Sequence, residues 1–226
     1  MKKIALGTAQ FGMDYGINPQ NLQVNNSDVS DILDFATNNG INFLDTASTY
    51  GNSEEVLGDV GVDSFNLITK TRYFAKDSII QNDIFDFVSD FKNSLRFLKQ
   101  KSIYGLLVHS ADDLLKPGSE KLFDQMIQLK KKGLVSKVGV SVYSSNQIHE
   151  IIQRFEVDII QVPINILDRR LIDNGTLRTL NIRGIEVHAR SIFLQGLLLM
   201  DKEILPSKFN KWDSLWGVWH QWLNDN

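Results

Sequence analysis

Four side chains that can donate, accept or steer protons lie at or just beyond the ends of short apolar segments. Asp45 directly follows the apolar segment 42–44, and Tyr50 lies five residues further on. Lys70 and His109 each end a later apolar segment. A phenol with a pKa of about 10 is a poor acid at neutral pH, but a nearby ammonium stabilises the phenolate and lowers that pKa. The four residue types therefore suit proton donation by Tyr50 to an oxygen atom on which negative charge develops.

The other three residues have supporting roles in this chemistry. We expect Asp45 to orient and neutralise Lys70, and His109 to polarise or position a carbonyl oxygen. Each residue alone has an ordinary structural explanation: a strand-end Asp caps a turn, a loop Tyr packs, and Lys70 with Asp45 forms a plain ion pair. The joint placement of all four at the ends of successive segments favours a catalytic interpretation.

The segments that position these side chains alternate between two kinds. Seven short apolar stretches predict strands at 3–6, 42–44, 66–69, 105–108, 137–142, 158–162 and 184–187. Longer stretches predict helices at 27–39, 54–59, 83–99, 119–132, 145–155 and 174–181, and apolar residues recur in 83–99 at three- and four-residue spacing. We expect Ser27 to cap the first helix and Gly40 and Gly133 to end two others.

Strands that are apolar on both faces and are each followed by a helix predict a parallel sheet with right-handed crossovers. A doubly wound nucleotide-binding sheet would need Gly-x-Gly-x-x-Gly after the first strand, and residues 6–12 do not supply it. Polar residues at the carboxyl ends of strands favour a (β/α)8 barrel of the TIM type. The expected fold is one α/β domain over residues 1–226 with about seven βα units. Its first and seventh strands would present free edges for self-association.

A final helix is predicted over residues 208–223, and its apolar stripe holds all four tryptophans of the chain. Spacing of this kind is typical of core packing, and a role in the wall of a substrate site is the alternative. His149 on a polar helix face and His220 beside the stripe are expected to be structural.

Composition excludes several classes of protein. The chain has 226 residues, no cysteine and a formal net charge of -3, with 42% hydrophobic and 23% charged residues. This is ordinary globular composition, so thiol chemistry, thiolate metal sites and a disulfide scaffold are excluded, and no nucleic-acid partner is expected. No apolar run approaches the length of a membrane helix, and the start lacks a secretory signal. We expect a cytoplasmic protein without a metal site.

The polar segments together resemble the aldo-keto reductase family. Asp45-Thr-Ala, Tyr50-Gly-Asn-Ser-Glu and Leu57-Gly resemble the family's signature around its catalytic tyrosine. Lys70 in Ile-Thr-Lys-Thr and His109 in Leu-Leu-Val-His-Ser are similar to two further family positions. The resemblance implies that these residues form the catalytic set Asp45, Tyr50, Lys70 and His109.

The same resemblance implies a cofactor site. The family reduces carbonyl compounds by hydride transfer from NADPH, less often NADH, without a metal. Val138-Gly-Val-Ser141 and Asp158-Ile-Ile-Gln161 resemble the two strands that hold the nicotinamide carboxamide. The implied cofactor-binding residues are Gly7, Thr8, Ser141, Gln161, Arg190 and Ser191.

Three departures from the family pattern leave alternatives open. Val142 stands where the family usually has Asn, and Arg190 where it often has a Tyr that stacks on the nicotinamide. The guanidinium of Arg190 either stacks in the same way or serves an anionic substrate group, for which Arg169 and Arg170 are further candidates. The family's eighth strand and cofactor-phosphate loop would follow residue 226. A noncatalytic or cofactor-deficient barrel is therefore one alternative to a reductase, and a lyase that uses Lys70 for a Schiff base is another.

Overall fold

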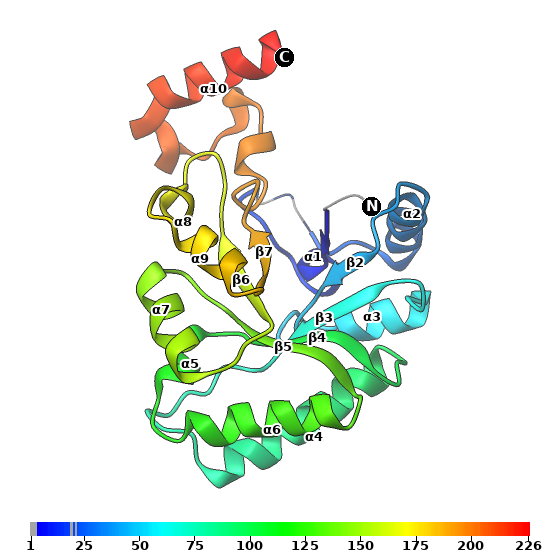
Figure 1. Cartoon of the computed structure of the whole chain (residues 1–226). Coiled ribbons are helices and arrows are strands. Elements are labelled where there is room, and N and C mark those ends of the chain that lie inside the picture. The colour runs from blue at the N-terminus through cyan, green and yellow to red at the C-terminus, as the bar shows by residue number, and fades with distance from the viewer. Residues whose placement is uncertain (1–3, 19, 21) are drawn as a thin grey trace.

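The computed structural model describes residues 4–18, 20 and 22–226. Its seven strands pair in parallel in the order of the chain, from β1 to β7. The strands are β1 (Leu6–Gly7), β2 (Phe43–Asp45), β3 (Asn66–Lys70), β4 (Ile103–Val108), β5 (Val135–Ser141), β6 (Ile159–Pro163) and β7 (Glu186–Arg190). The sheet curls, and helices surround its outer side (Figure 1). This is the predicted α/β barrel architecture with seven βα units.

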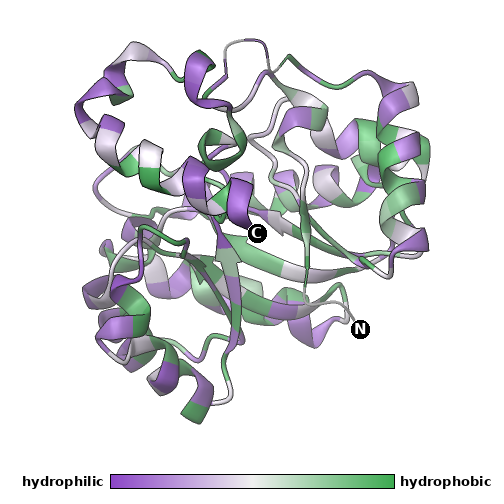
Figure 2. Cartoon of the chain, turned by 90° about the horizontal axis from the view of Figure 1, so that it is seen from above, coloured by the Kyte–Doolittle hydropathy of each residue, from purple (hydrophilic) through white to green (hydrophobic). Residues whose placement is uncertain are grey.

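The helices that follow the strands have the predicted order, with short additional ones between them. They are α1 (Ala9–Gly12), α2 (Asn26–Asn38), α3 (Ser53–Val60), α4 (Gln81–Phe97), α5 (Ala111–Leu115), α6 (Ser119–Lys131), α7 (Ser145–Arg154), α8 (Arg170–Asp173) and α9 (Thr176–Ile182). Viewed from above, these helices carry hydrophilic and hydrophobic residues side by side, as amphipathic helices against a sheet should (Figure 2).

Two layers of apolar side chains stabilise the sheet. Outside it, α4 buries Ile84, Phe87 and Phe91, which confirms the predicted three- and four-residue spacing. Inside the curl, a smaller cluster forms around Ile68 and Leu107. Burial of apolar surface stabilises the folded state by about 25 cal/mol per Å². The two layers therefore hold the strands in place, and with them the residues at the strand ends.

Local signals explain where several elements begin and end. The prediction that Ser27 caps the first helix was wrong: the side chain of Asn25 accepts a hydrogen bond from the backbone N–H of Asp28 and caps α2. Ser27 instead donates to the Asn25 side chain. Gly40 and Gly133 adopt φ of +71° and +72° after α2 and α6, as predicted.

The bounds of the first and last predicted strands moved. The prediction 3–6 includes residue 3, which lies outside the described residues, and β1 is described at Leu6–Gly7. The strand predicted at 184–187 is found further along the chain, as β7 (Glu186–Arg190). The reason is that Gly184 adopts a left-handed φ of +69° and still belongs to the turn after α9. Arg190 therefore becomes the last residue of a strand, at the same end of the sheet as the other polar side chains.

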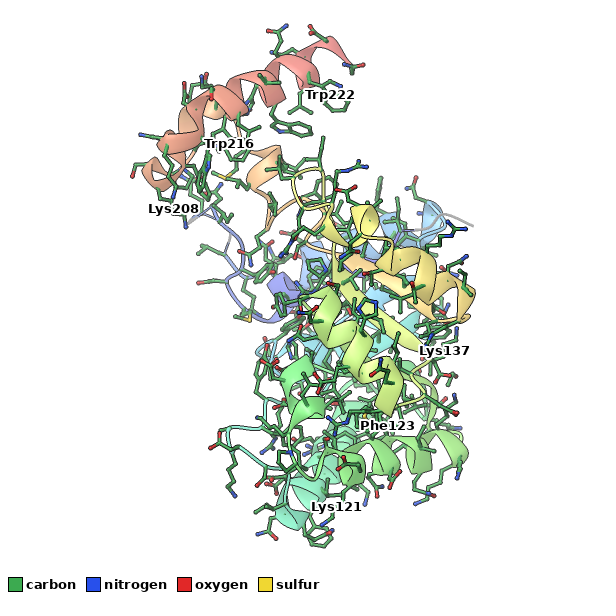
Figure 3. The ribbon with its side chains drawn as sticks, turned by 60° about the vertical axis from the view of Figure 1, so that its left-hand side comes forward. Lys121, Phe123, Lys137, Lys208, Trp216 and Trp222 are labelled. Atoms are coloured by element: carbon green, nitrogen blue, oxygen red, sulfur yellow. The ribbon has the colours of Figure 1, made fainter. Side chains whose placement is uncertain are left out.

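The chain after β7 forms a second, smaller apolar cluster. Three short 3-10 helices, at Leu197–Leu199, Lys202–Ile204 and Ser207–Trp212, lead into α10 (Asp213–Asp225). The predicted single helix 208–223 is thus a 3-10 segment followed by an α-helix. This C-terminal segment projects from one end of the barrel (Figures 1 and 3).

Packing of the tryptophan stripe differs from the prediction. Only Trp216 is buried, within a cluster that includes Leu197, Leu198 and Met200, whereas Trp212 is 44% and Trp222 51% exposed. The stripe therefore packs on residues that follow β7, and it does not join the core of the barrel. His220 ties this cluster together, because its two ring nitrogens lie 2.7 Å from the Trp216 carbonyl oxygen and 2.9 Å from that of Met200.

Among the described residues, β1 pairs only with β2 and β7 only with β6, so the sheet is not closed by a strand between β7 and β1. No helix within residues 4–18 and 22–226 is long and apolar enough to cross a membrane.

Candidate active site

The polar residues singled out from the sequence meet at the carboxyl ends of the parallel strands. The last residues of β2, β3, β5 and β7 are Asp45, Lys70, Ser141 and Arg190. His109 directly follows β4, and Gln161 lies on β6. Neighbouring strands are in register at this end, with Gly7 opposite Asp45 and Ser141 opposite Gln161. The shared edge of the sheet therefore forms one mouth, as predicted.

A buried ion pair lies at the centre of this mouth. The Lys70 ammonium donates to both carboxylate oxygens of Asp45 and to the backbone oxygen of Thr46, each at 2.8 Å. Lys70 is 2% exposed. With three acceptors around its three N–H bonds, Lys70 has no position for attack on a carbonyl carbon, which weighs against the Schiff-base alternative.

Tyr50 is held over this ion pair by two glycines. A Cβ atom on Gly12 would lie 1.9 Å from the backbone oxygen of Tyr50, and one on Gly51 would lie 2.0 Å from the backbone oxygen of Gly12. Gly51 also adopts a φ of +55°. The loop that carries Tyr50 therefore packs backbone to backbone against α1, an approach that only glycine permits. The Lys70 Nζ atom lies 5.1 Å from the centroid of the Tyr50 ring.

The electrostatics of Tyr50 differ from the expectation. Burial, followed by the negative charge of Asp45, raises the pKa of Tyr50 well above its ordinary value, while Arg190 acts to lower it. The prediction of a lowered pKa for Tyr50 was therefore wrong, since the net shift is upward. The physical reason is that Asp45 neutralises the ammonium at 2.8 Å. Tyr50 is consequently a neutral phenol at physiological pH, ready to donate a proton.

His109 stands beside Tyr50 in a neutral form. The Tyr50 and His109 ring centroids are 5.8 Å apart, edge to face, and the Tyr73 ring stacks on the imidazole with its centroid 4.5 Å away. Burial and then the charge of Lys70 lower the pKa of His109 to about 4. The Thr49 hydroxyl lies 3.2 Å from Nδ1 of His109. When this hydroxyl donates to Nδ1, Nε2 carries the ring proton and can donate it to a substrate oxygen.

Hydroxyl groups behind the mouth lock the first strand to the ion pair. The Thr8 hydroxyl donates to the backbone oxygen of Asp45 at 3.1 Å, and the Ser53 hydroxyl donates to the backbone oxygen of Thr8 at 2.9 Å. Thr8 is fully buried, and its hydroxyl group and backbone oxygen are hydrogen-bonded within the protein. Gly7 is exposed and has open space where a Cβ atom would be, which leaves room for a ligand at the rim.

Ser141 and Gln161 fit the carboxamide of a nicotinamide. Both are 3% exposed and lie side by side on β5 and β6. The Gln161 side-chain nitrogen donates to Asp45 at 2.9 Å, and its Oε1 atom accepts no hydrogen bond from a described residue. An amide ligand needs one acceptor for its NH2 group and one donor for its oxygen, which Gln161 Oε1 and the Ser141 hydroxyl can supply.

Arg190 reaches across the mouth from β7 to β5. Its Nε atom lies 3.3 Å from the Ser141 hydroxyl, and its Nη2 atom lies 3.2 Å from the backbone oxygen of Val142. The guanidinium carbon is 4.1 Å from the centroid of the Tyr143 ring. Ser191 accepts from Arg190 Nη1 at 3.2 Å and adopts a φ of +58°, a conformation that costs a residue other than glycine free energy.

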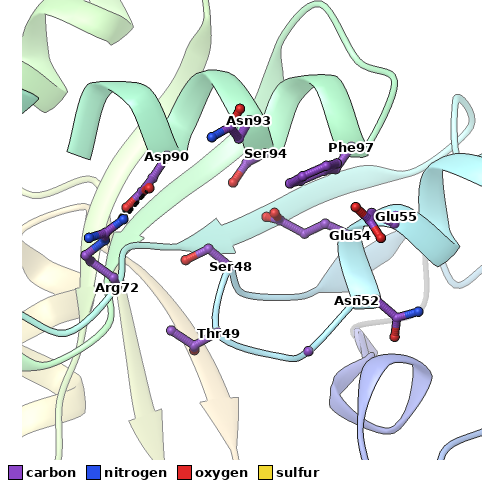
Figure 4. Close-up of a pocket in the computed structure, with 11 residues that line it drawn as sticks. Ser48, Thr49, Asn52, Glu54, Glu55, Arg72, Asp90, Asn93, Ser94 and Phe97 are labelled. Atoms are coloured by element: carbon purple, nitrogen blue, oxygen red, sulfur yellow. Dashed lines mark hydrogen bonds and ion pairs between the residues drawn. The ribbon is translucent and has the colours of Figure 1, made fainter. Parts of the chain in front are cut away.

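A separate pocket lies behind the Tyr50 loop, between α3 and α4 (Figure 4). It has a volume of about 360 Å³, and its lining includes Thr49, Glu54 and the Arg72–Asp90 ion pair. Glu54 is 6% exposed and accepts a hydrogen bond of 2.6 Å from Thr69, and burial raises its pKa. None of the four predicted catalytic residues lines this pocket, so we place the chemistry at the mouth.

Three residues at the mouth were not predicted from the sequence: Thr49, Tyr73 and Tyr143. Thr49 is only one residue from Tyr50, but nothing in a sequence indicates that its hydroxyl would face an imidazole from β4. Tyr73 and Tyr143 are 57% and 61% exposed and lie two or three residues beyond strand ends. An aromatic residue placed just after a strand whose end carries a candidate residue is the signal that could have found them.

The fold and the site together define a class of protein. A curled parallel sheet of the barrel type carries a Tyr, a Lys–Asp pair and a His together at the carboxyl ends of its strands. A sequence model described as "Aldo/keto reductase family" matches residues 3–221. The chain belongs to the aldo/keto reductase family.

Individual relatives agree with this assignment. The oxidoreductase YqkF of Bacillus subtilis (strain 168), itself uncharacterised, is 27% identical over 208 residues, which are 88% of this chain and 67% of YqkF. A Pseudomonas aeruginosa protein described as an aldo-keto reductase superposes with a TM-score of 0.70 at 23% identity, covering 88% of this chain and 74% of that one. An aldo-keto reductase from Bacillus halodurans, solved in a holo form, gives a TM-score of 0.69 at 24% identity, with 91% and 66% covered.

A further solved structure includes a nicotinamide cofactor. An aldo-keto reductase of Bombyx mori in complex with NADP has a TM-score of 0.62 and 21% identity, and the match covers 84% of this chain and 62% of that one. At this level of identity the likeness concerns the fold.

Proposed function

We propose that this protein reduces a small carbonyl compound, such as an aldehyde, a ketone or a sugar-like substrate, with a reduced nicotinamide cofactor. NADPH is the proposed cofactor and NADH the alternative. One observation carries the proposal: Tyr50 lies over a Lys70–Asp45 pair that is bonded through both carboxylate oxygens, and His109 stands beside it.

Each member of the cluster has a distinct role. Tyr50 is protonated at neutral pH and donates its proton to the carbonyl oxygen as negative charge develops there, because an alkoxide is a stronger base than the phenolate that is left. His109 is neutral and donates from Nε2 to the same oxygen, which orients the carbonyl group. Lys70 and Asp45 form a fixed ion pair beneath the Tyr50 ring, and the charge of Arg190, which acts to lower the pKa of Tyr50, favours the phenolate that remains after the proton has left.

Ser141 and Gln161 would hold the cofactor's carboxamide at the carboxyl end of the sheet, next to these groups. When bound, the reduced nicotinamide would supply a hydride to the carbonyl carbon. Tyr50 gives its proton to the carbonyl oxygen, so that the product is an alcohol, and Tyr50 regains a proton from solvent. Gln161 also donates to Asp45 and so links the cofactor site to the ion pair.

A spectroscopic assay tests this proposal. Oxidation of NADPH is followed by the loss of its near-ultraviolet absorbance in the presence of a panel of aldehydes, and the same panel is repeated with NADH. Tyr50→Phe should lower kcat by about 100-fold to 10,000-fold, the usual contribution of a general acid.

Tyr104→Phe is the matched control. Tyr104 lies on β4 and donates to Glu186 inside the barrel, and it should leave kcat within a few fold. Equal kcat for wild type and Tyr50→Phe would refute the mechanism.

Binding has to be separated from turnover. Calorimetric titration with NADPH should give a dissociation constant in the micromolar range or below, and Gln161→Ala should weaken it by about tenfold, the effect of one lost hydrogen bond with a buried partner. Absence of NADPH binding to the wild-type protein would favour a noncatalytic barrel.

A further inference from the structure

Among the described residues of the mouth, Arg190 is the one whose charge has no counter-charge. Lys70 pairs with Asp45, and on the loop and helix that follow β6, Arg170 pairs with Asp168. In the part of the chain that the structure describes, no carboxylate lies within ion-pair distance of Arg190. Its three hydrogen bonds go to neutral oxygens and are 3.2 to 3.3 Å long.

This unpaired charge acts on the reacting groups. The positive charge of Arg190 contributes to lowering the pKa values of both Tyr50 and His109, so it is close enough to be felt at both. Lys70 and Asp45 cancel, and His109 is neutral. The mouth therefore carries a net charge of about +1, and a half-buried cation of this kind is stabilised when an anion joins it.

The guanidinium is also fixed in orientation. Tyr143 covers one face of it, and bonds to the Ser141 hydroxyl and the Val142 carbonyl oxygen hold it at the end of β5. A pre-organised guanidinium with long bonds to neutral acceptors can exchange one of them for a shorter, charge-assisted bond to a carboxylate or phosphate oxygen.

We propose that Arg190 binds an anionic group on the substrate, so that the preferred substrates are small carbonyl compounds that carry a carboxylate or a phosphate. This inference rests on the proposed reductase function and adds its substrate class. The carbonyl oxygen lies between Tyr50 and His109, and the anionic group lies on the β7 side against Arg190. The Tyr73 ring stacks on His109 at the carbonyl end of this arrangement, and the Tyr143 ring stacks on Arg190 at its anionic end.

The test compares pairs of substrates with and without an anionic group. For the carboxylate arm, kcat/KM is measured for 4-carboxybenzaldehyde and benzaldehyde, and for the phosphate arm, for glyceraldehyde 3-phosphate and glyceraldehyde. In the wild type at least one charged substrate should be preferred by about tenfold to 100-fold, the worth of a charge-assisted hydrogen bond. The arm with the larger ratio identifies the anion.

Arg190→Gln should bring that ratio close to one, whereas Arg190→Lys, which keeps the charge without the planar fork, should retain part of it. Arg178→Gln is the matched control, because Arg178 is exposed on α9 and its loss changes the net charge equally. A ratio that is unchanged in Arg190→Gln overturns the proposal, and it would mean that Arg190 serves the cofactor, whose binding affects both substrates alike.

A binding measurement separates this inference from the proposed function. Turnover of the neutral aldehydes tests the reductase function alone. If no aldehyde is reduced, calorimetric titration with benzoate and inorganic phosphate still decides whether Arg190 holds an anion. Binding that is lost in Arg190→Gln and kept in Arg178→Gln supports the anion site, and binding that is equal in both variants, or absent from the wild type, overturns it.

Discussion

At the scale of single residues, two different features act on Tyr50: an ion pair lies below its ring, and burial raises its pKa. The charge of Lys70 is neutralised by Asp45, and the pKa of Tyr50 is raised by burial and by the Asp45 charge. Tyr50 is thus set to give up a proton to a developing alkoxide, while the ion pair holds its position below the ring. The raised pKa does not prevent this transfer, because an alkoxide is a stronger base than a phenolate.

Loss of Asp45 should destabilise the folded protein as well as impair the reaction. Asp45→Asn leaves the ammonium of Lys70, which is 2% exposed, without its counter-charge. Because removing one partner of a buried pair leaves an uncompensated charge, we expect the free energy of unfolding to fall by about 3 kcal/mol. Urea denaturation measures this change.

The exposed ion pair between Lys99 and Asp59 provides the control for Asp45→Asn. Both of its side chains are more than 60% exposed. Asp59→Asn should change the free energy of unfolding by less than about 1 kcal/mol. Equal effects of Asp45→Asn and Asp59→Asn would contradict a buried pair at the mouth.

His109 should make the protein sensitive to mild acid. Its pKa is about 4 in the folded protein and about 6.5 in an unfolded chain, so the unfolded state binds more protons between these values. The resulting stability is fully present above pH 6.5 and is lost as the pH falls through 4. Unfolding free energies measured from pH 7 to 4 should show a decline that His109→Gln reduces. His149→Gln, on the exposed face of α7, should leave the decline as it is.

At the scale of elements, close contacts of the backbone position the site. The short helix α1 and the Tyr50 loop meet at Gly12 and Gly51, without side chains between them. We expect Gly12→Ala to push the Tyr50 loop outward, since its Cβ atom would lie 1.9 Å from a backbone oxygen. The expected result is a fall in kcat of at least about tenfold and a lower melting temperature, seen in the NADPH assay and by circular dichroism.

Gly217→Ala is the control for Gly12→Ala. Gly217 lies in α10, where a Cβ atom would meet nothing within 4 Å. Because Ala is the better helix former by about 1 kcal/mol, this change should leave activity intact and should not lower stability. A Gly12→Ala protein with unchanged activity would show that the contact with the Tyr50 loop is not needed.

Much of this arrangement could be predicted from the sequence because it depends on local signals. Helical spacing, apolar strands and glycine turns predicted the order of elements. The parallel sheet then required Asp45, Lys70 and His109 to meet at one end. What the sequence could not provide depends on three-dimensional neighbours. The Asn25 cap competed with Ser27 two residues away, and the raised pKa of Tyr50 follows chiefly from burial, which no motif encodes.

At the scale of the whole molecule, the edges of the sheet stand out. In the described residues β7 pairs with a strand on one side only, β6. Because the backbone N–H and C=O groups of a parallel strand point alternately to its two sides, those on the other side of β7 have no partner strand among these residues. We expect two copies to associate through this edge, giving a mass that rises with concentration in light scattering. Ala189→Lys, on the exposed face of β7, should reduce the association because charged residues protect free edges. A monomeric wild type at all concentrations would contradict this prediction.

The separate C-terminal cluster also determines what an optical experiment on this protein can detect. All four tryptophans of the chain lie in the C-terminal segment, where Trp219 and Trp222 stack at 5.3 Å and Trp216 is 3% exposed. Three of the five tyrosines lie at the mouth: Tyr50, Tyr73 and Tyr143. Indole emission therefore originates outside the barrel, and phenol emission largely from its reacting end. Tryptophan emission therefore reports on the C-terminal segment, and a change confined to the mouth should leave it unaltered.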